Sequence, residues 1–383
     1  MDIISAIGSI NALIIAFLIY RKKTRSISDN ILIIWVLNFA LHFAILFLNE
    51  KNLLLHETNW GFILGIVLVL HTPFLYIYTK SLTDKNFLLN LKTLANYGVI
   101  FIYIIAFIPN LLMSTEERSN LVYNKEGIPF QAFIPMFTLL FCQIYFLIRT
   151  LIILLKHQYN IKREFSYEDK INLVWIKRIV YGFASIILLS FVAYGLVSAK
   201  IISIYHMDWS ISIINMILFF FIAYYGYQQK SVYRSDQMVE RKRTENKENK
   251  VAKESATNQP TSYNKEESNE IHPKIVALTK IMANEKLYLD PELSIGNLAN
   301  QLGVHSHQLS KLINTELNKN FFEFVNEYRV EEYKKLIVKP ENKHISILGL
   351  AMDAGFNSKA TFNRFFKNTT GLTPSEFRES YKF

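Results

Sequence analysis

Long apolar segments alternate with short polar intervals over the first 228 residues of the chain. Within these segments Ile, Leu, Phe, Val and Tyr follow one another with almost no polar positions, whereas a helix of a soluble bundle has a polar face. A helix needs roughly 20 mostly apolar residues to cross the hydrocarbon core of a bilayer. Seven segments meet this requirement, namely 3–20, 30–48, 60–79, 94–112, 131–155, 174–198 and 209–228. The pattern therefore predicts a seven-span transmembrane domain over residues 1–228.

The charges beside these segments predict the orientation of the domain. The first segment is preceded by Asp2 and followed by basic residues, the reverse of a secretory signal peptide, so we expect it to be a retained span. Lys and Arg concentrate in the first, third and fifth loops and their flanks, at Arg21, Lys22, Lys23, Arg25, Lys80, Lys85, Lys92, Lys156, Lys162, Arg163, Lys170, Lys177 and Arg178. The other loops carry only Lys51, Arg118, Lys125 and Lys200. Because cytoplasmic loops carry such an excess, we expect a multi-pass protein of the bacterial cytoplasmic membrane with its N-terminus outside and its C-terminus in the cytoplasm.

Polar side chains within the spans are candidates for signal detection, because they are costly in lipid unless they face the interior of the bundle. The candidates are Asn38, His42, His71, Gln143 and Asn215. His42 and His71 lie on adjacent predicted spans and are the candidate ligand-sensing residues. The alternative is that they form only an interhelical hydrogen bond, a common use of polar residues in membranes. Proton coupling is disfavoured, because no Asp or Glu lies in the middle of a span.

Residues 229–270 differ in composition from both of their neighbours. They are rich in charges of both signs and in amide side chains, and they contain few apolar residues. Such a stretch cannot bury enough apolar surface to fold alone. We therefore predict a flexible linker, which would also permit proteolytic release of the residues that follow it.

Residues 271–383 contain two stretches with the spacing of a helix-turn-helix. Each places an alanine four positions before a glycine, Ala299 before Gly303 and Ala351 before Gly355. The alanine lets two helices cross closely, and the glycine adopts the left-handed backbone that the turn needs. An amphipathic segment follows each glycine. The chain is therefore predicted to be all-α, with a two-unit helix-turn-helix domain after the linker.

The polar faces of these two amphipathic segments are the candidate DNA-binding surface. The outward positions are predicted to be Ser306, His307, Gln308, Ser310, Lys311 and Asn314 in the first segment, and Lys359, Ala360, Thr361, Asn363, Arg364 and Lys367 in the second. A helix in the major groove needs such a mixture of hydrogen-bonding and cationic side chains. Arg364 and Lys311 can donate to guanine O6 and N7. Gln308 and Asn363 can pair with adenine, and Lys367 suits a phosphate contact. For any single residue the alternative is a solvated helix face.

Three short motifs follow one another near the end of the chain: Gly355-Phe-Asn-Ser358, Phe362-Asn-Arg364-Phe-Phe-Lys367 and Gly371-Leu-Thr-Pro374. With these motifs residues 271–383 resemble the DNA-binding domain of the AraC/XylS family. The resemblance implies seven helices that bind two successive major-groove faces about one turn apart. By position, it implies base contacts from His307, Ser310, Lys311, Lys359, Ala360 and Arg364. Lys311 and Ile313 depart from the arginine and phenylalanine frequent in the family, which leaves the base preference of the first unit open.

The membrane half resembles the multi-pass sensor region of AraC-type regulators from Bacteroidetes, through the stretch Pro73-Phe-Leu-Tyr-Ile-Tyr-Thr-Lys-Ser81. This resemblance names no ligand. Together the two resemblances imply a regulator that senses a signal through its spans and binds promoter DNA.

Net charge and cysteine content narrow the function further. The net charge of +10 indicates an anionic partner, either lipid headgroups or nucleic-acid phosphate. Cys142 is the only cysteine, and the sequence has no His-Glu-x-x-His, no phosphate-binding glycine loop and no carboxylate pair within a span. We expect no enzymatic activity and no cofactor or metal. The expected partners are promoter DNA, membrane lipid, an unidentified signal ligand, RNA polymerase and a second copy of the chain. The alternative is a membrane enzyme or transporter with a regulatory DNA-binding tail.

Overall fold

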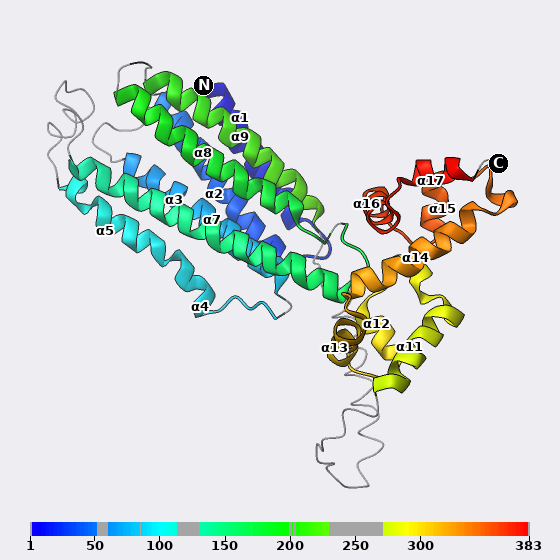
Figure 1. Ribbon diagram of the computed structural model, residues 1–383. Coiled ribbons are helices and arrows are strands. Elements are labelled where there is room, and N and C mark those ends of the chain that lie inside the picture. Colours follow the sequence, from blue (N-terminus) through cyan, green and yellow to red (C-terminus); the bar gives the residue numbers. More distant parts are fainter. Residues whose placement is uncertain are drawn as a thin grey trace, which may run out of the picture. The chain divides into compact units, whose positions relative to one another are not determined.

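The computed structural model describes residues 2–51, 60–84, 86–112, 130–169, 171–198, 201, 204–229 and 271–381 (Figure 1). The described residues are helical apart from turns, short connections and one isolated β-bridge, so the predicted all-α class is confirmed. The chain divides into two compact units. The first comprises residues 1–155 and 173–233, and the second comprises residues 156–172 and 234–383. The predicted flexible linker lies outside the described residues beyond Gln229.

Long apolar helices make up most of the first unit. They are α1 (Asp2–Tyr20), α2 (Ile27–Glu50), α3 (Trp60–Thr83), α7 (Phe130–Glu164), α8 (Val174–Ser198) and α9 (Ile204–Gln228). These six helices are long and apolar enough to cross a membrane, judged by length and composition. The end of α7, from Lys156, belongs to the second unit.

The fourth predicted span, 94–112, forms a shorter helix than we expected. The chain forms the short helix α4 (Leu91–Leu94), the 3-10 turn η1 (Ala95–Gly98) and then α5 (Val99–Leu111), which has 13 residues. At about 1.5 Å per residue, α5 covers roughly 20 Å, less than the roughly 30 Å of a hydrocarbon core. Glycine is a poor helix former, and the 3-10 turn ends at Gly98. Among the described residues, six helices rather than seven have the length of a span.

Helix α2 is at the centre of the packing in the first unit. It contacts α1, α3 and α9, and α8 packs against α9. Trp35, Phe39 and Phe43 on α2 are buried. The glycine at Gly226 lets α9 approach α2, because a Cβ there would lie 2.7 Å from Leu32 Cδ2. The apolar segments thus form a packed bundle in which the small residue sets the helix spacing.

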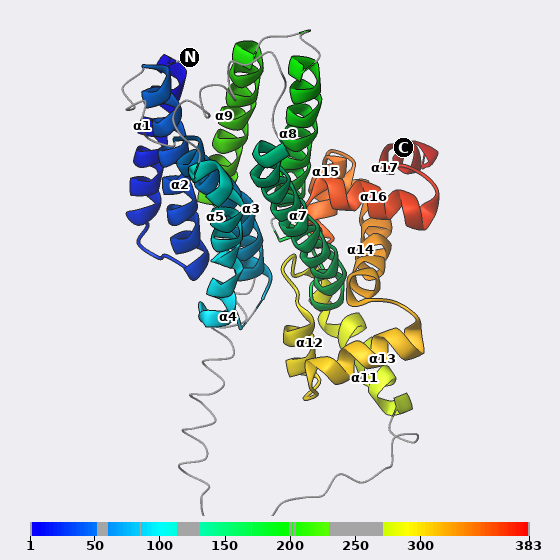
Figure 2. The same ribbon diagram turned by 90° about the vertical axis from the view of Figure 1, so that its left-hand side faces the viewer.

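The second unit contains the C-terminal helices. They are α11 (Ile271–Glu285), η2 (Leu287–Leu289), α12 (Ile295–Gln301), α13 (Ser306–Leu317), α14 (Phe321–Ile337), η3 (Pro340–Asn342), α15 (Ile347–Asp353), α16 (Lys359–Thr370) and α17 (Pro374–Ser380). Helix α14 lies between α11–α13 and α15–α17 in both views (Figure 1, Figure 2). It contributes Phe324 and Val325 to the hydrophobic core on one side, and Val330 and Tyr333 to the core on the other. α14 therefore joins two small cores.

Candidate nucleic-acid interface

Two helix pairs, α12–α13 and α15–α16, each have a buried alanine and a left-handed glycine at their turn. Ala299 is 1% exposed and Ala351 is fully buried. The φ angles are +68° at Gly303 and +94° at Gly355, as the spacing predicted. A Cβ at Gly355 would also lie 2.3 Å from the main-chain oxygen of Tyr288, so no larger residue fits there. We call α12–α13 the first subdomain and α15–α16 the second subdomain.

The second helix of each pair, α13 or α16, is the candidate recognition helix. Their predicted apolar faces are buried at Leu309, Ile313, Phe362 and Phe366. Ser358 caps the start of α16, where its hydroxyl accepts the N–H of Thr361, and Gly371 caps the end with a φ of +78°. The two caps set the length of the helix, and burial of Phe362 and Phe366 leaves its polar face outward.

Most of the predicted DNA-contact residues lie on the exposed faces of these helices. The exposed ones are Ser306, His307, Gln308, Lys311, Lys359, Ala360, Asn363, Arg364 and Lys367. Two outward predictions were wrong, because Ser310 is 9% exposed and Thr361 is 5% exposed. Ser310 precedes the buried Ile313 by three positions, and Thr361 precedes Phe365, which packs against the second core, by four. Each therefore lies toward the inner face of its helix.

Gln308 and Arg364 form contacts within the second unit. Gln308 Oε1 accepts the main-chain N–H of His305 at 3.3 Å, which closes the first turn of α13. Arg364 forms an ion pair with Glu168, with 2.5 Å between Nη2 and Oε2. The sequence pattern assigned Glu168 only to a loop between two spans. No linear signal marks it as a neighbour of α16.

Helix α14 carries a buried arginine that sequence reasoning missed. The Arg329 side chain donates from Nε to the main-chain oxygen of Tyr288 and from Nη2 to that of Asp290, each at 2.7 Å. Burial lowers the pKa of this guanidinium to about 9, although the charge of Asp290 raises it, so Arg329 is charged at neutral pH. A signal was present in the sequence, because Arg329 lies four positions from both Val325 and Tyr333 on the apolar face of the helix.

A second polar contact ties η2 to α14. Glu332 accepts hydrogen bonds from Lys286 Nζ at 2.9 Å and from the Tyr288 hydroxyl at 3.0 Å. Burial alone raises the pKa of Glu332, but these two hydrogen bonds and the lysine charge hold it below its usual value of 4.5. The carboxylate is therefore ionised at neutral pH and stabilises this connection.

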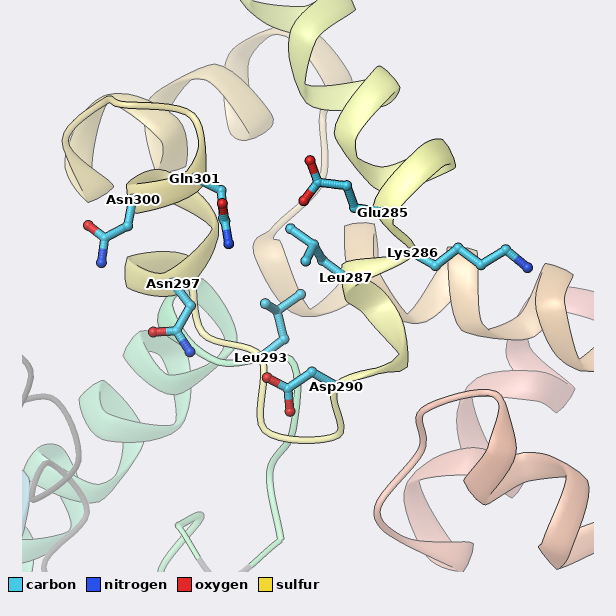
Figure 3. Close-up of a pocket in the computed structure, with 8 residues that line it drawn as sticks. All are labelled: Glu285, Lys286, Leu287, Asp290, Leu293, Asn297, Asn300 and Gln301. Atoms are coloured by element: carbon cyan, nitrogen blue, oxygen red, sulfur yellow. The ribbon is translucent and has the colours of Figure 1, made fainter.

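A surface hollow of about 510 Å³ lies between the end of α11 and α12. Figure 3 shows Leu287 and Leu293 near its middle and Asn297 and Gln301 along α12. The lining combines acidic, basic and amide side chains with these two leucines. Leu293 also contributes its main-chain oxygen to a contact with Ser166, described below.

In the first unit, the structure brings the two candidate sensing residues together. His42 on α2 and His71 on α3 are buried, and His71 Nε2 lies 3.3 Å from His42 Nδ1. Trp35 Nε1 donates to His71 Nδ1 at 3.3 Å, and Asn38 Nδ2 donates to the main-chain oxygen of Val67 at 3.0 Å. Because an indole can only donate, His71 accepts at Nδ1 and donates to His42 from Nε2. The pair is part of a hydrogen-bonded network between α2 and α3. Within the described ranges, no three His, Cys, Asp or Glu side chains form a group that suits a metal ion.

Comparison with known proteins agrees with this geometry. A family model described as a helix-turn-helix domain matches residues 298–380, from α12 to α17. A probable transcription factor, PqrA of Proteus vulgaris, is 31% identical over 102 residues, which are 27% of this chain and 76% of that protein. The chain belongs to the AraC family of transcriptional regulators. This assignment agrees with the resemblance that the motifs around Gly355 and Arg364 indicate.

Other relatives of this AraC-family protein share a smaller part of their length. An uncharacterized HTH-type transcriptional regulator in the cgkA 5′ region of Pseudoalteromonas carrageenovora is 28% identical, over 26% of this chain and 60% of that protein. An uncharacterized HTH-type transcriptional regulator, YfiF of Bacillus subtilis, is 27% identical, over 32% of this chain and 38% of that protein. No solved structure matches the chain. In each of these comparisons, most of the chain lies outside the similarity.

Proposed function

We propose that this AraC-family protein is a membrane-embedded transcription regulator, which senses a signal through its apolar helices and binds promoter DNA through α13 and α16. The observation that supports it most directly is that one chain contains both six membrane-length apolar helices and two helix-turn-helix subdomains. In this proposal residues 1–228 form the transmembrane sensor domain, 229–270 the linker and 271–383 the DNA-binding domain. The N-terminus lies outside the cytoplasmic membrane and the DNA-binding domain lies in the cytoplasm, as the excess of Lys and Arg in alternate loops indicates.

The outer faces of the apolar helices support a membrane environment. On α1, Ile10 and Phe17 are 56% and 60% exposed, and on α8 Leu188 and Phe191 are 63% and 59% exposed. Soluble monomers rarely leave contiguous apolar patches larger than a few hundred Å² in water. Lipid tails around these faces would remove the free-energy cost of exposing them to water.

The exposed faces of α13 and α16 support sequence-specific DNA binding. Lys311 and Arg364 would donate to guanine, and Lys367 would contact phosphate. Phosphate contacts make affinity depend on salt, whereas base contacts select the sequence. A second copy of the chain and RNA polymerase are further partners in this proposal. The protein is not proposed to be an enzyme.

The experiment selects duplexes from a random pool with the full-length protein in lipid nanodiscs at physiological salt. We expect enrichment of a bipartite motif with halves roughly ten base pairs apart. Arg364→Ala or Lys311→Ala should relax the corresponding half of the motif, because each removes one base contact. Lys280→Ala on α11 is the matched control, since it removes one positive charge outside both recognition helices.

Two results would contradict the proposal. One is binding that depends steeply on salt but enriches no motif, because that describes contacts to phosphate alone. The other is an unchanged motif in both the Arg364→Ala and the Lys311→Ala variants, which would remove α13 and α16 as the base-contacting helices.

A further inference from the structure

The end of α7 and the residues after it pack onto the DNA-binding domain within the second unit. We call residues 162–169 the docked segment. Phe165 is 1% exposed and forms an antiparallel β-bridge with Ser294, the residue that caps α12. The next residue, Ser166, is fully buried, and its N–H donates to the main-chain oxygen of Leu293 at 3.1 Å. The segment is thus held against the domain by main-chain pairing.

Helix α14 holds Ser166 with two side chains. Asn326 Nδ2 donates to the main-chain oxygen of Ser166 at 3.0 Å. Arg329 Nη1 donates to the same oxygen at 2.9 Å, and Arg329 Nη2 donates to the Ser166 hydroxyl at 2.9 Å. The hydroxyl in turn donates to Leu293 at 2.8 Å. These buried groups of α14 therefore have the docked segment as a hydrogen-bonding partner.

The docked segment also reaches both candidate recognition helices. Glu168, with a side chain only 9% exposed, pairs with Arg364 on α16. Arg163 Nη2 lies 3.4 Å from the hydroxyl of Ser310 on α13, which is one of the positions that the sequence predicted to face DNA. Lys162 Nζ lies 3.7 Å from Glu168 Oε1 and adds a second cation beside the carboxylate. One short segment thus contacts both candidate recognition helices, at the buried Ser310 on α13 and at the exposed Arg364 on α16.

We propose that the docked segment is an intramolecular ligand of the DNA-binding domain and that Glu168 competes with DNA for Arg364. The inference rests on the proposed role of Arg364 as a DNA contact. A guanidinium binds a carboxylate with the same N–H groups that it offers to a phosphate or to guanine O6 and N7. Arg364 cannot serve both partners fully at once, so docking of the segment and binding of DNA weaken each other by the same factor.

This competition connects the membrane helices to the DNA-binding helices. The docked segment begins on α7, and α7 is one of the six helices long enough to span a membrane. A change in α7 that withdraws the segment would release Arg364, without any force passing through residues 229–270. Release of Glu168 is therefore the step by which the apolar helices would control DNA affinity.

The test measures the affinity of the full-length protein in nanodiscs for a duplex carrying the selected motif, by fluorescence anisotropy at fixed salt. Glu168→Gln keeps the shape of the side chain but removes its charge, and a charge-assisted hydrogen bond is about twice as strong as a neutral one. We expect binding on the order of fivefold tighter. Asp169→Asn removes a neighbouring negative charge that has no ion pair with Arg364 among the described residues, and it should change affinity little.

Ser166→Ala provides a second variant that alters no charge. It removes the hydroxyl between Arg329 and Leu293, loosens the docked segment and should also tighten DNA binding. In an Arg364→Ala background the gain from Glu168→Gln should disappear, because the competed residue is gone.

The outcomes separate this inference from the proposed function. If Arg364→Ala weakens binding while Glu168→Gln and Ser166→Ala leave it unchanged or weaken it, the competition is refuted and the DNA-binding role stands. If Asp169→Asn tightens binding as much as Glu168→Gln, the gain is general electrostatics and the competition is again refuted. If Arg364→Ala leaves both affinity and motif unchanged, the assigned DNA contact and the competition for it are refuted together.

Discussion

Replacing Arg329 by alanine should destabilise the DNA-binding domain more than any surface substitution. The side chain is 1% exposed, and its donors bond to main-chain oxygens of Tyr288, Asp290 and Ser166. Each buried acceptor left without a partner costs about 1–3 kcal/mol, although water entering the vacated space would satisfy some of them. For three such acceptors, partly satisfied by water, we therefore expect a loss of about 3–5 kcal/mol. This is a large share of the roughly 5–15 kcal/mol that keeps a domain folded.

Hydrogen exchange of the full-length protein in nanodiscs measures this loss at α14. A loss of 3 kcal/mol corresponds to roughly hundredfold faster exchange of the α14 amides. Arg378→Ala is the matched control, because Arg378 also donates to main-chain oxygens, those of Ile345 and Lys343, but is only half-buried. It should accelerate exchange less than about fivefold. Equal effects of the two substitutions on exchange would show that burial of Arg329 adds nothing to the stability of the domain, and would refute this prediction.

Three further predictions concern the turns, the pH dependence and the membrane network. Gly355→Ala should destabilise the second subdomain by more than the roughly 1 kcal/mol expected of Gly303→Ala. The reason is that a Cβ at Gly355 would clash with the main chain of Tyr288, whereas a Cβ at Gly303 would meet no atom. Hydrogen exchange that is equally fast in both variants would contradict this. The lowered pKa of Glu332 means that its contribution to stability is complete above pH 4.5 and is lost as the pH falls through the folded-state pKa. The loss of stability with falling pH should therefore be less steep in Glu332→Gln. An unchanged pH profile would exclude this carboxylate as a source of acid sensitivity. His71→Ala should alter the output of a transcription reporter at unchanged protein level. Asn215→Ala should not, because it removes only a hydrogen bond to Ile211 of the same helix. Equal outputs would argue that the histidine network is purely structural.

Much of the fold could be predicted from the sequence because the signals for it are local. A run of apolar residues, a Thr-Pro-x-Glu box or a glycine after an alanine acts over a few residues, and each determines where a helix begins, crosses or ends. The capping box at Thr373 begins α17, and the left-handed glycines at Gly303 and Gly355 match their predictions. The fourth span does not, because apolar composition alone cannot distinguish a 13-residue helix preceded by a 3-10 turn from a continuous one.

The tertiary structure alone decides which polar groups meet. Arg329 and Ser166 are 163 positions apart, and Arg364 and Glu168 are 196 positions apart, so no spacing rule relates them. Sequence reasoning identified Arg364 as a DNA contact from its place on a polar helix face, which is a local property. The ion pair of Arg364 with Glu168 forms only because the docked segment packs against α16, far away in the sequence. The sequence by itself determined the helices and their exposed faces, whereas long-range packing determined which of those faces are occupied.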